Sequence, residues 1–551
     1  MQLVNRIHFR NWRGDLFGGL TAAVIALPMA LAFGVATGAG ATAGLYGAVL
    51  IGLFASLFGG TPALISEPTG PMTVVMTAAI ANLVAANPEN GLELAFTTVM
   101  MAGLLQIGFG LLKLGRYVTL MPYTVISGFM SGIGIILLIL QLAPFLGQPA
   151  PPGGVIGTLE QLPQILSNIN PIETLLAGLT VAIIFFTPNA ISRWVPAQLV
   201  ALLLGTCVPL LFFPNLELRQ IQDLGEFSTR LPYLHTPTFR TSQLQMMLTN
   251  AAVLAMLGSI DALLTSVVAD SLTRTEHDSD KELIGQGIGN LAAGLFGGIP
   301  GAGATMGTVV NIQAGGKTIL SGLIRALILV IVVLGAGNLM QSIPLAVLAG
   351  IVFKVGLDIV DWGFLKRAHK ISSKGALITY SVIFLTVFVD LIVAVGVGVF
   401  VADTLTIDRL SKLRSKGVKT ITDADDEIDL SDQERRLLDQ AKGRVLIFQL
   451  SGPMIFGVAK AISREHQALE NCDVLILDLT NVPHLGVTSS LALENALQEA
   501  AEKNRTIFLV GAKEQSRSRL NRLEVLSLIP ENRRLQSRTE ALEIAVGLVN
   551  V

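Results

Sequence analysis

Long apolar runs separated by short polar turns fill the first 408 residues of the chain. Several of these runs reach or approach the roughly 20 residues that a helix needs to cross a bilayer. Pro and Gly interrupt the pattern and shorten the runs near residues 72 and 302. We therefore predict an α-helical polytopic membrane protein with fourteen spans, near residues 16–36, 43–58, 72–86, 95–112, 121–145, 173–190, 196–213, 247–270, 283–298, 302–315, 319–338, 343–358, 375–389 and 390–407.

The distribution of Lys and Arg between the predicted spans supports the same number. Positive residues are retained on the cytoplasmic side of a membrane. With fourteen spans and a cytoplasmic N-terminus, the inner segments carry thirteen Lys and Arg, and the outer loops carry three, namely Arg219, Arg230 and Arg240. Removing one span would invert this alternation halfway along the chain. We therefore predict that both termini are cytoplasmic and that the apolar run after Arg13 is a retained first span.

Charged residues are concentrated at the end of the chain. Residues 409–551 hold 40 of the 78 Asp, Glu, Lys and Arg, although charged residues make up only 14% of the whole chain. A soluble domain averages about 25%. Buried strands alternating with helices predict an α/β domain, with strands at 445–450, 474–479 and 506–510 and helices at 487–503 and 538–549. The predicted organisation is a transmembrane domain at 1–408, a charged linker at 409–443 and a soluble domain at 444–551.

A short motif occurs once in each half of the membrane region. Gly-Gly-x-Pro stands at 59–62 and again at 297–300, and each copy leads to a Thr-Val-Val, at 73–75 and 308–310. Each copy precedes the third span of a seven-span half. Because seven is odd, the second half must cross the membrane upside down, and inverted repeats of this kind are typical of secondary transporters. Chance similarity between two apolar stretches is the alternative.

The segments 66–71 and 300–305, which follow the repeated motif, predict a binding site. Both are too rich in Pro and Gly for a continuous helix facing lipid, and irregular backbone at membrane depth is tolerated where it lines a cavity. Half-helices that begin there would direct their free N–H groups at one small volume, which could bind an anion without a Lys or Arg. When the halves are aligned on Thr73 and Thr308, Thr69 and Ala304 occupy equivalent positions.

One acidic residue lies in the middle of the predicted eighth span. An ionisable side chain at this depth marks an ion or proton pathway by default. Thr265 lies one turn after Asp261 and therefore on the same helix face. A carboxylate, a hydroxyl and carbonyls freed by a broken helix would form an oxygen cage suited to Na⁺. A protonated Asp261 bonded to a neighbouring span is the alternative, and Glu67 is a second acid that lies either near the site or towards the cytoplasm.

Enzymatic chemistry finds no support in the sequence. Gly315-Gly316-Lys317-Thr318 resembles the end of a P-loop, but Asn311 stands where the first glycine is required. The six His and two Cys show no metal-ligand spacing, no Ser/His/Asp arrangement stands out, and a net charge of −2 gives no indication of a nucleic-acid partner. We therefore expect neither an enzyme nor a cofactor.

Several short motifs together resemble the SulP (sulfate permease) family of anion transporters. They cover nearly the whole chain, and their joint occurrence is specific although each is weak alone. They are Leu27-Pro28-Met29-Ala30-Leu31-Ala32, Gly44-Leu45-Tyr46, Gly128-Phe129, Glu282-Leu283-x-Gly285-Gln286-Gly287-x-x-Asn290 and Ala314-Gly315-Gly316-Lys317-Thr318. The soluble domain is similar to the STAS domains that end SulP transporters.

The resemblance, which is strongest to bicarbonate-carrying members, implies core and gate domains built of seven-plus-seven inverted repeats. It implies Na⁺-driven bicarbonate uptake at the plasma (inner) membrane by an elevator-like motion, with Na⁺ as coupling ion. It also implies a homodimer formed through the STAS domain. The implied Na⁺ ligands are Asp261, Thr265, Gly303, Ala304 and Thr305, and the implied anion site lies between Pro68, Thr69, Gly70 and Ala302, Gly303, Ala304.

Departures from the family pattern leave two points open. Met29 replaces a frequent Gln, which bears on anion preference, and the tenth span lacks a basic residue found in many animal members, which fits a bound Na⁺ supplying that charge. In the STAS domain the family's Asp is missing before Thr488 and Ser489, so we expect a helix N-cap there rather than phosphoryl regulation.

Two other functions compete with the Na⁺ symporter. One is an H⁺-coupled symporter of sulfate or another small anion, and the other is a membrane sensor without transport.

Overall fold

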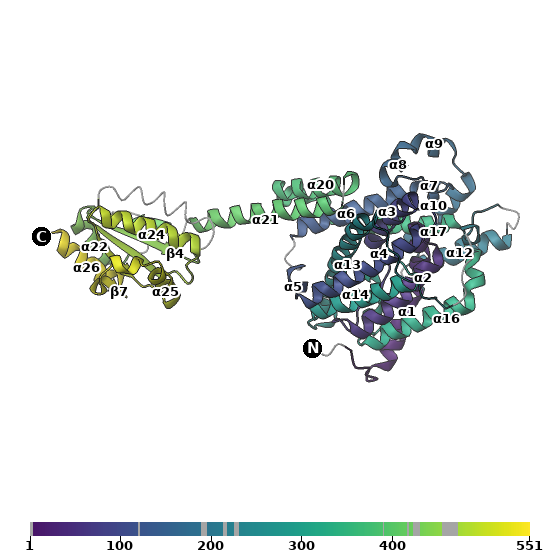
Figure 1. Cartoon of the computed structure of the whole chain (residues 1–551), viewed down its shortest axis with the longest axis horizontal. Coiled ribbons are helices and arrows are strands. Elements are labelled where there is room, and N and C mark those ends of the chain that lie inside the picture. The colour runs from purple at the N-terminus through teal and green to yellow at the C-terminus, as the bar shows by residue number, and fades with distance from the viewer. Residues whose placement is uncertain are drawn as a thin grey trace. The chain divides into compact units, whose positions relative to one another are not determined.

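Helices follow all fourteen apolar segments in the computed structural model of the protein (Figure 1). It describes residues 4–118, 122–188, 195–212, 217–224, 231–389, 391–415, 418–421, 430–454 and 472–550. The fourteen helices are α1 (Trp12–Thr37), α2 (Ala41–Phe58), α3 (Gly70–Ala86), α4 (Gly91–Leu111), α6 (Tyr123–Leu140), α10 (Pro171–Phe186), α12 (Ala197–Phe212), α13 (Leu244–Thr273), α14 (Ser279–Leu295), α15 (Thr305–Gln313), α16 (Ile319–Gln341), α17 (Leu345–Ile359), α20 (Ser373–Phe388) and α21 (Leu391–Ser415).

By length and composition, six of the described helices are long and apolar enough to cross a membrane. Shorter helices lie between the fourteen. The short ones are α5 (Gly115–Val118), α7 (Leu142–Phe145), α8 (Gly154–Glu160), α9 (Leu162–Ser167), η1 (Ile221–Leu224), α18 (Trp362–Leu365) and α19 (Ala368–Ile371). The half-length α15 is among those too short for a full span, as expected for a helix that begins inside the membrane region.

The Gly-Gly motifs of the two halves make matching contacts with the opposite half. Gly59 packs so closely on Gly285 of α14 that a Cβ at Gly285 would lie 2.4 Å from the Gly59 nitrogen. In the other half Gly298 packs on Gly47 of α2, where a Cβ at Gly298 would lie 2.7 Å from the Gly47 nitrogen. Real Cβ atoms do not approach so closely, so both contacts require glycine. The exchange of partners between halves is what an internal two-fold repeat produces.

The two interrupted segments meet as a miniature antiparallel sheet. Strand β1 (Ser66–Glu67) pairs with β2 (Ala302–Gly303), with Ser66 opposite Gly303 and Glu67 opposite Ala302. Each strand runs directly into a half-helix, β1 into α3 and β2 into α15. Backbone N–H and C=O groups freed by the broken helices are thereby paired with each other, as a buried segment requires.

The membrane-region helices pack in two groups. In the first, α14 packs against α4 and α2, α1 against α2 and α16, and α13 against α3, α4 and α15. In the second, α6 packs against α20 and α17, and α10 against α17 and α12. Both crossover strands and both half-helices belong to the first group, and α17, α6 and α12 contact it through α1 and α3.

The chain divides into two compact units, Met1–Phe400 and Val401–Val551, and the second is an α/β domain. Its five-stranded sheet has the order β3-β4-β5-β6-β7, with β3 antiparallel to β4 and the remaining neighbours parallel. The strands are β3 (Val418–Ile421), β4 (Val445–Ser451), β5 (Val474–Asn481), β6 (Thr506–Val510) and β7 (Arg534–Leu535), and the helices are α22 (Asp432–Ala441), α24 (Val487–Glu502), α25 (Glu514–Arg522), η3 (Val525–Leu528), η4 (Glu531–Arg533) and α26 (Arg538–Val549).

Two details of this domain differ from expectation. The segment expected as a linker, 409–443, contributes β3 to the sheet and α22 to the packing on α26, because its apolar residues join the core beneath them. The expected N-cap at Thr488 or Ser489 is wrong. The cap residue is Gly486, which has no side chain, so Thr488 and Ser489 already lie inside α24.

Candidate functional site: the crossover of the two half-helices

The N-termini of α3 and α15 flank the β1–β2 pair. Thr69 is the N-cap residue of α3 and Ala304 that of α15, both in extended conformation and neither with a side-chain cap. The two positions that the repeat alignment made equivalent therefore play the same backbone role. Free N–H groups and the positive ends of two helix dipoles meet here, which is the arrangement that binds an anion.

Helix α13 brings oxygen atoms to the same crossover. Thr265 Oγ1 donates to the Gly303 carbonyl at 2.9 Å and shares a hydrogen bond with Thr305 Oγ1 at 2.8 Å. One turn earlier, Asp261 is 8% exposed, and its Oδ2 has no hydrogen-bond partner among the described residues. The Thr69 hydroxyl lies near this carboxyl without reaching hydrogen-bond geometry, and it too is unpartnered.

The sequence-predicted residues thus gather around one location. Thr265, Gly303 and Thr305 are in direct contact, and Thr69 lies beside Asp261. The remaining ones belong to the backbone around them. Pro68 and Gly70 flank the α3 cap, Ala302 is paired in the two-stranded sheet, and the Ala304 nitrogen donates to the Ile65 carbonyl at 2.8 Å.

A polar ladder of three side chains on α14 forms hydrogen bonds with the segments around the crossover. Glu282, Gln286 and Asn290 are spaced one turn apart, and all are fully buried or nearly so. The Gly60 nitrogen donates to Glu282, Gln286 donates to Ser66 Oγ at 2.6 Å, and Asn290 bonds both the N–H and the carbonyl of Gly301 at 2.9 Å. These three residues belong to a motif of the family resemblance. In the structure they hold the backbone of Gly60 and Gly301 and the side chain of Ser66, on both sides of the crossover.

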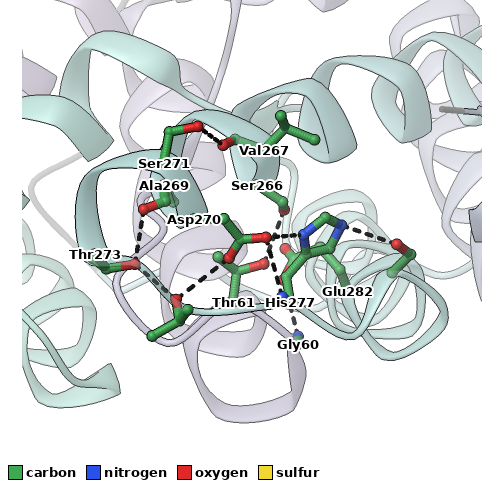
Figure 2. Close-up of polar contacts among 12 residues, drawn as sticks. Gly60, Thr61, Ser266, Val267, Ala269, Asp270, Ser271, Thr273, His277 and Glu282 are labelled. Carbon is green, nitrogen blue, oxygen red and sulfur yellow. Dashed lines mark hydrogen bonds and ion pairs between the residues drawn. The ribbon is translucent and has the colours of Figure 1, made fainter.

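The far end of α13 is tied to the first Gly-Gly motif. Ser266 Oγ and Thr61 Oγ1 lie 2.8 Å apart, beside the Gly60–Glu282 contact (Figure 2). His277 lies between Asp270 and Ser279, with Nδ1 2.6 Å from Asp270 Oδ2 and Nε2 2.9 Å from Ser279 Oγ. No motif had indicated this Ser/His/Asp arrangement. It joins the last turns of α13 to the start of α14 and so orders their connection.

Arg325 is a buried cation that the sequence analysis did not identify, and its partner Glu67 had no assigned place. Arg325 of α16 is 0% exposed, and its Nη2 donates to Glu67 Oε2 at 2.5 Å. Glu67 is therefore buried against α16. A single Arg in an apolar run of 23 residues does not break the hydropathy pattern, but its cost at membrane depth was the signal that could have revealed it.

The fold and this crossover define a helical membrane transporter. The model described as the sulfate permease family matches residues 12–382, and that of the STAS domain matches 437–540. The chain therefore belongs to the sulfate permease family and ends in a STAS domain.

Three proteins of known name or structure are similar to the chain. The chain is 68% identical over 546 residues to the bicarbonate transporter BicA of Synechocystis, a match that covers 99% of this chain and 96% of that protein. The solved transmembrane domain of a cyanobacterial BicA is 70% identical, with a TM-score of 0.67, and covers 71% of this chain and 100% of that one. SLC26A9 is similar in fold, with a TM-score of 0.81 at 18% identity over 99% of this chain and 92% of that one.

Proposed function

We propose that the chain is a Na⁺-dependent bicarbonate symporter that takes bicarbonate up across the inner membrane. The observation that carries this proposal is the unpartnered, buried carboxylate oxygen of Asp261 beside the paired half-helices. A buried charge without a partner is costly, so this atom is suited to a bound cation. The identity to the BicA transporters supports bicarbonate as the anion.

Na⁺ would be held by Asp261, Thr265, Gly303, Ala304 and Thr305. Oxygen atoms of Thr265, Gly303 and Thr305 already converge, since Thr265 Oγ1 contacts both the Gly303 carbonyl and Thr305 Oγ1. Asp261 lies one turn before Thr265 on the same helix. Carbonyls of an unwound segment and one carboxylate are the groups with which transporters of this type coordinate Na⁺. The Asp261 carboxylate would balance the charge of the ion.

Bicarbonate would lie between Pro68, Thr69 and Gly70 on one side and Ala302, Gly303 and Ala304 on the other. The unpartnered Thr69 hydroxyl could donate to it, and the helix N-termini would supply N–H groups and partial positive charge. The small residues of the second segment leave the backbone accessible. The nearby Na⁺ would further favour an anion, so each substrate would bind more tightly in the presence of the other.

An elevator-like motion agrees with how the helices pack. Every proposed ligand lies in the group that contains α3, α13 and α15, and that group contacts the second one through α1 and α3. Sliding of the first group against the second would carry both substrates together. We also propose that the protein forms a homodimer through the STAS domain. Both termini would be cytoplasmic, which is the orientation that the Lys and Arg distribution favours.

The alternative is an H⁺-coupled symporter of sulfate or another small anion, in which Asp261 carries a proton. Uptake of labelled bicarbonate and of labelled sulfate by the purified full-length protein in liposomes separates the two. We expect bicarbonate uptake that stops when external Na⁺ is replaced by choline and that resists an excess of sulfate. Uptake that follows a pH gradient and continues in choline would establish the alternative, and no uptake of any anion would refute both.

A further inference from the structure

We propose that the buried Glu67–Arg325 ion pair makes the anion site selective for a monovalent over a divalent anion, by holding the charge beside the site at zero. The inference rests on the proposed function, since it assumes that the anion binds at the crossover. It assigns a role to two residues that contact neither proposed substrate.

The pair is built into the packing of three elements. Arg325 Nη1 donates to the carbonyls of Ala48 and Ser66, each at 3.1 Å, while Nη2 bonds Glu67. A Cβ at Gly52 would lie 2.3 Å from Nη1, so that position leaves the room that the guanidinium fills. The charge of Arg325 is therefore fixed in place and shielded from water.

Both charges lie beside the proposed anion ligands. Glu67 stands two residues before Thr69, a reach of about 7 Å at most, and is paired with Ala302 across the two-stranded sheet. Its Oε1 also faces the first turn of α15, where a Cβ at Gly307 would lie 3.4 Å away. The carboxylate is thus near the N-terminus of each half-helix.

Removing one charge of the pair changes the affinity of the site for anions. Each helix N-terminus carries roughly half a positive charge, so two of them together match an anion of charge −1. A unit charge roughly 10 Å away in a protein interior changes affinity on the order of tenfold for each unit of ligand charge. The affinity for bicarbonate would change by one such factor, and the affinity for sulfate would change by the product of two. An unbalanced Arg325 would favour the divalent anion, and an unbalanced Glu67 would disfavour it.

Three variants test this on the full-length protein. Glu67→Gln keeps a hydrogen-bond acceptor for Arg325 but removes the negative charge, and we expect labelled sulfate to bind about tenfold more tightly relative to bicarbonate. Arg325→Gln should change the ratio in the opposite direction. The double variant Glu67→Gln/Arg325→Gln is neutral again and should return the ratio towards that of the parent. Glu173→Gln is the matched control, since Glu173 is also buried and paired with an Arg, Arg219, but lies on α10 in the other helix group.

Binding of labelled sulfate to the purified variants, with bicarbonate as competitor, reads the charge effect apart from transport. A parent that carries no bicarbonate refutes the proposed function, while the binding ratios still report on the pair. Ratios that stay equal in all variants, or a double variant that differs from the parent as much as Glu67→Gln does, overturn the inference. If neither single variant can be purified, a changed ratio in the double variant alone overturns the inference, because the neutral pair should leave the ratio as in the parent.

Discussion

The two crossover segments share a backbone plan but differ in the groups that they present. The first, from Ser66 to Gly70, carries a paired carboxylate at Glu67 and an unpartnered hydroxyl at Thr69. The second, from Gly301 to Thr305, presents small residues whose carbonyls and N–H groups are held by Asn290 and Thr265. The first half thus offers side chains, and the second half offers mainly backbone.

This difference shows what an inverted repeat fixes and what it leaves free. The repeat fixes where the two helices begin, because Thr69 and Ala304 are both N-cap residues. It leaves each half free to specialise. In the proposed function the second half, next to Asp261 and Thr265, would hold the cation, and the first half, with its hydroxyl and balanced charge pair, would orient the anion.

Asp261→Asn should have the largest effect, because it removes the formal charge of the proposed cation site. We expect Na⁺-dependent uptake to be abolished while the protein remains folded in the membrane, since Asn keeps the size of the side chain. Uptake assays with Na⁺ or choline outside measure this. Na⁺ dependence equal to that of the parent would remove Asp261 from the site.

Ala304→Leu should block uptake nearly as completely. The change adds three heavy atoms at the N-cap of α15, where the proposed anion approaches the backbone. Ala78→Leu adds the same atoms to an exposed position of α3 and should leave uptake intact, which controls for a general effect of bulk. Transport by Ala304→Leu at the parent rate would mean that the anion does not bind against this segment.

Thr69→Val should have an intermediate effect. It keeps the volume of the side chain but removes the hydroxyl that the first half contributes. A hydrogen bond to a charged group is worth roughly 1.5–3 kcal/mol, so the half-saturating bicarbonate concentration should rise about ten- to a hundredfold. Thr21→Val on α1 is the matched control, since the Thr21 hydroxyl bonds only its own helix in the described structure. Unchanged kinetics in Thr69→Val would exclude Thr69 from the site.

The smallest effect is expected in the STAS domain, where we predict that the Glu434–Arg538 ion pair stabilises the fold. Burial alone would raise the pKa of Glu434, but hydrogen bonds and charge from Arg538, at 2.9 Å to each carboxylate oxygen, lower that pKa to about 2 from its ordinary 4.5. A lowered pKa stabilises the fold above the ordinary value, and the stability is lost as the pH falls towards the lowered one. The pair should contribute about 2 kcal/mol at neutral pH, allowing for solvent screening.

Hydrogen exchange in α22 and α26 of the full-length protein measures that contribution. Between pH 6 and pH 3 the parent should lose protection there more steeply than Glu434→Gln, which has no charge to lose. Glu499→Gln, in an exposed pair with Lys503, should behave like the parent. Equal pH profiles for parent and Glu434→Gln would contradict the assignment, and neither variant should change which anion is carried.

The sequence predicted much of this arrangement because its signals are local. Apolar runs predicted the helices, and the repeated Thr-Val-Val gave the alignment that makes Thr69 and Ala304 equivalent. The partners of Arg325 could not be found this way, because Glu67 lies 258 residues away in sequence and nothing in either segment indicates the other. Glu282, Gln286 and Asn290 were visible in the sequence as part of a family motif, but the first of the two segments that they hold comes from a distant part of the chain.

Coupled entry of Na⁺ and bicarbonate would show whether the two ions bind together at the crossover. Liposomes containing the purified protein would be given an inward bicarbonate gradient and labelled Na⁺ at equal concentration on both sides. We expect the bicarbonate gradient to drive Na⁺ inwards in the parent and not in Asp261→Asn. Bicarbonate entry in the parent without accompanying Na⁺ would contradict the account.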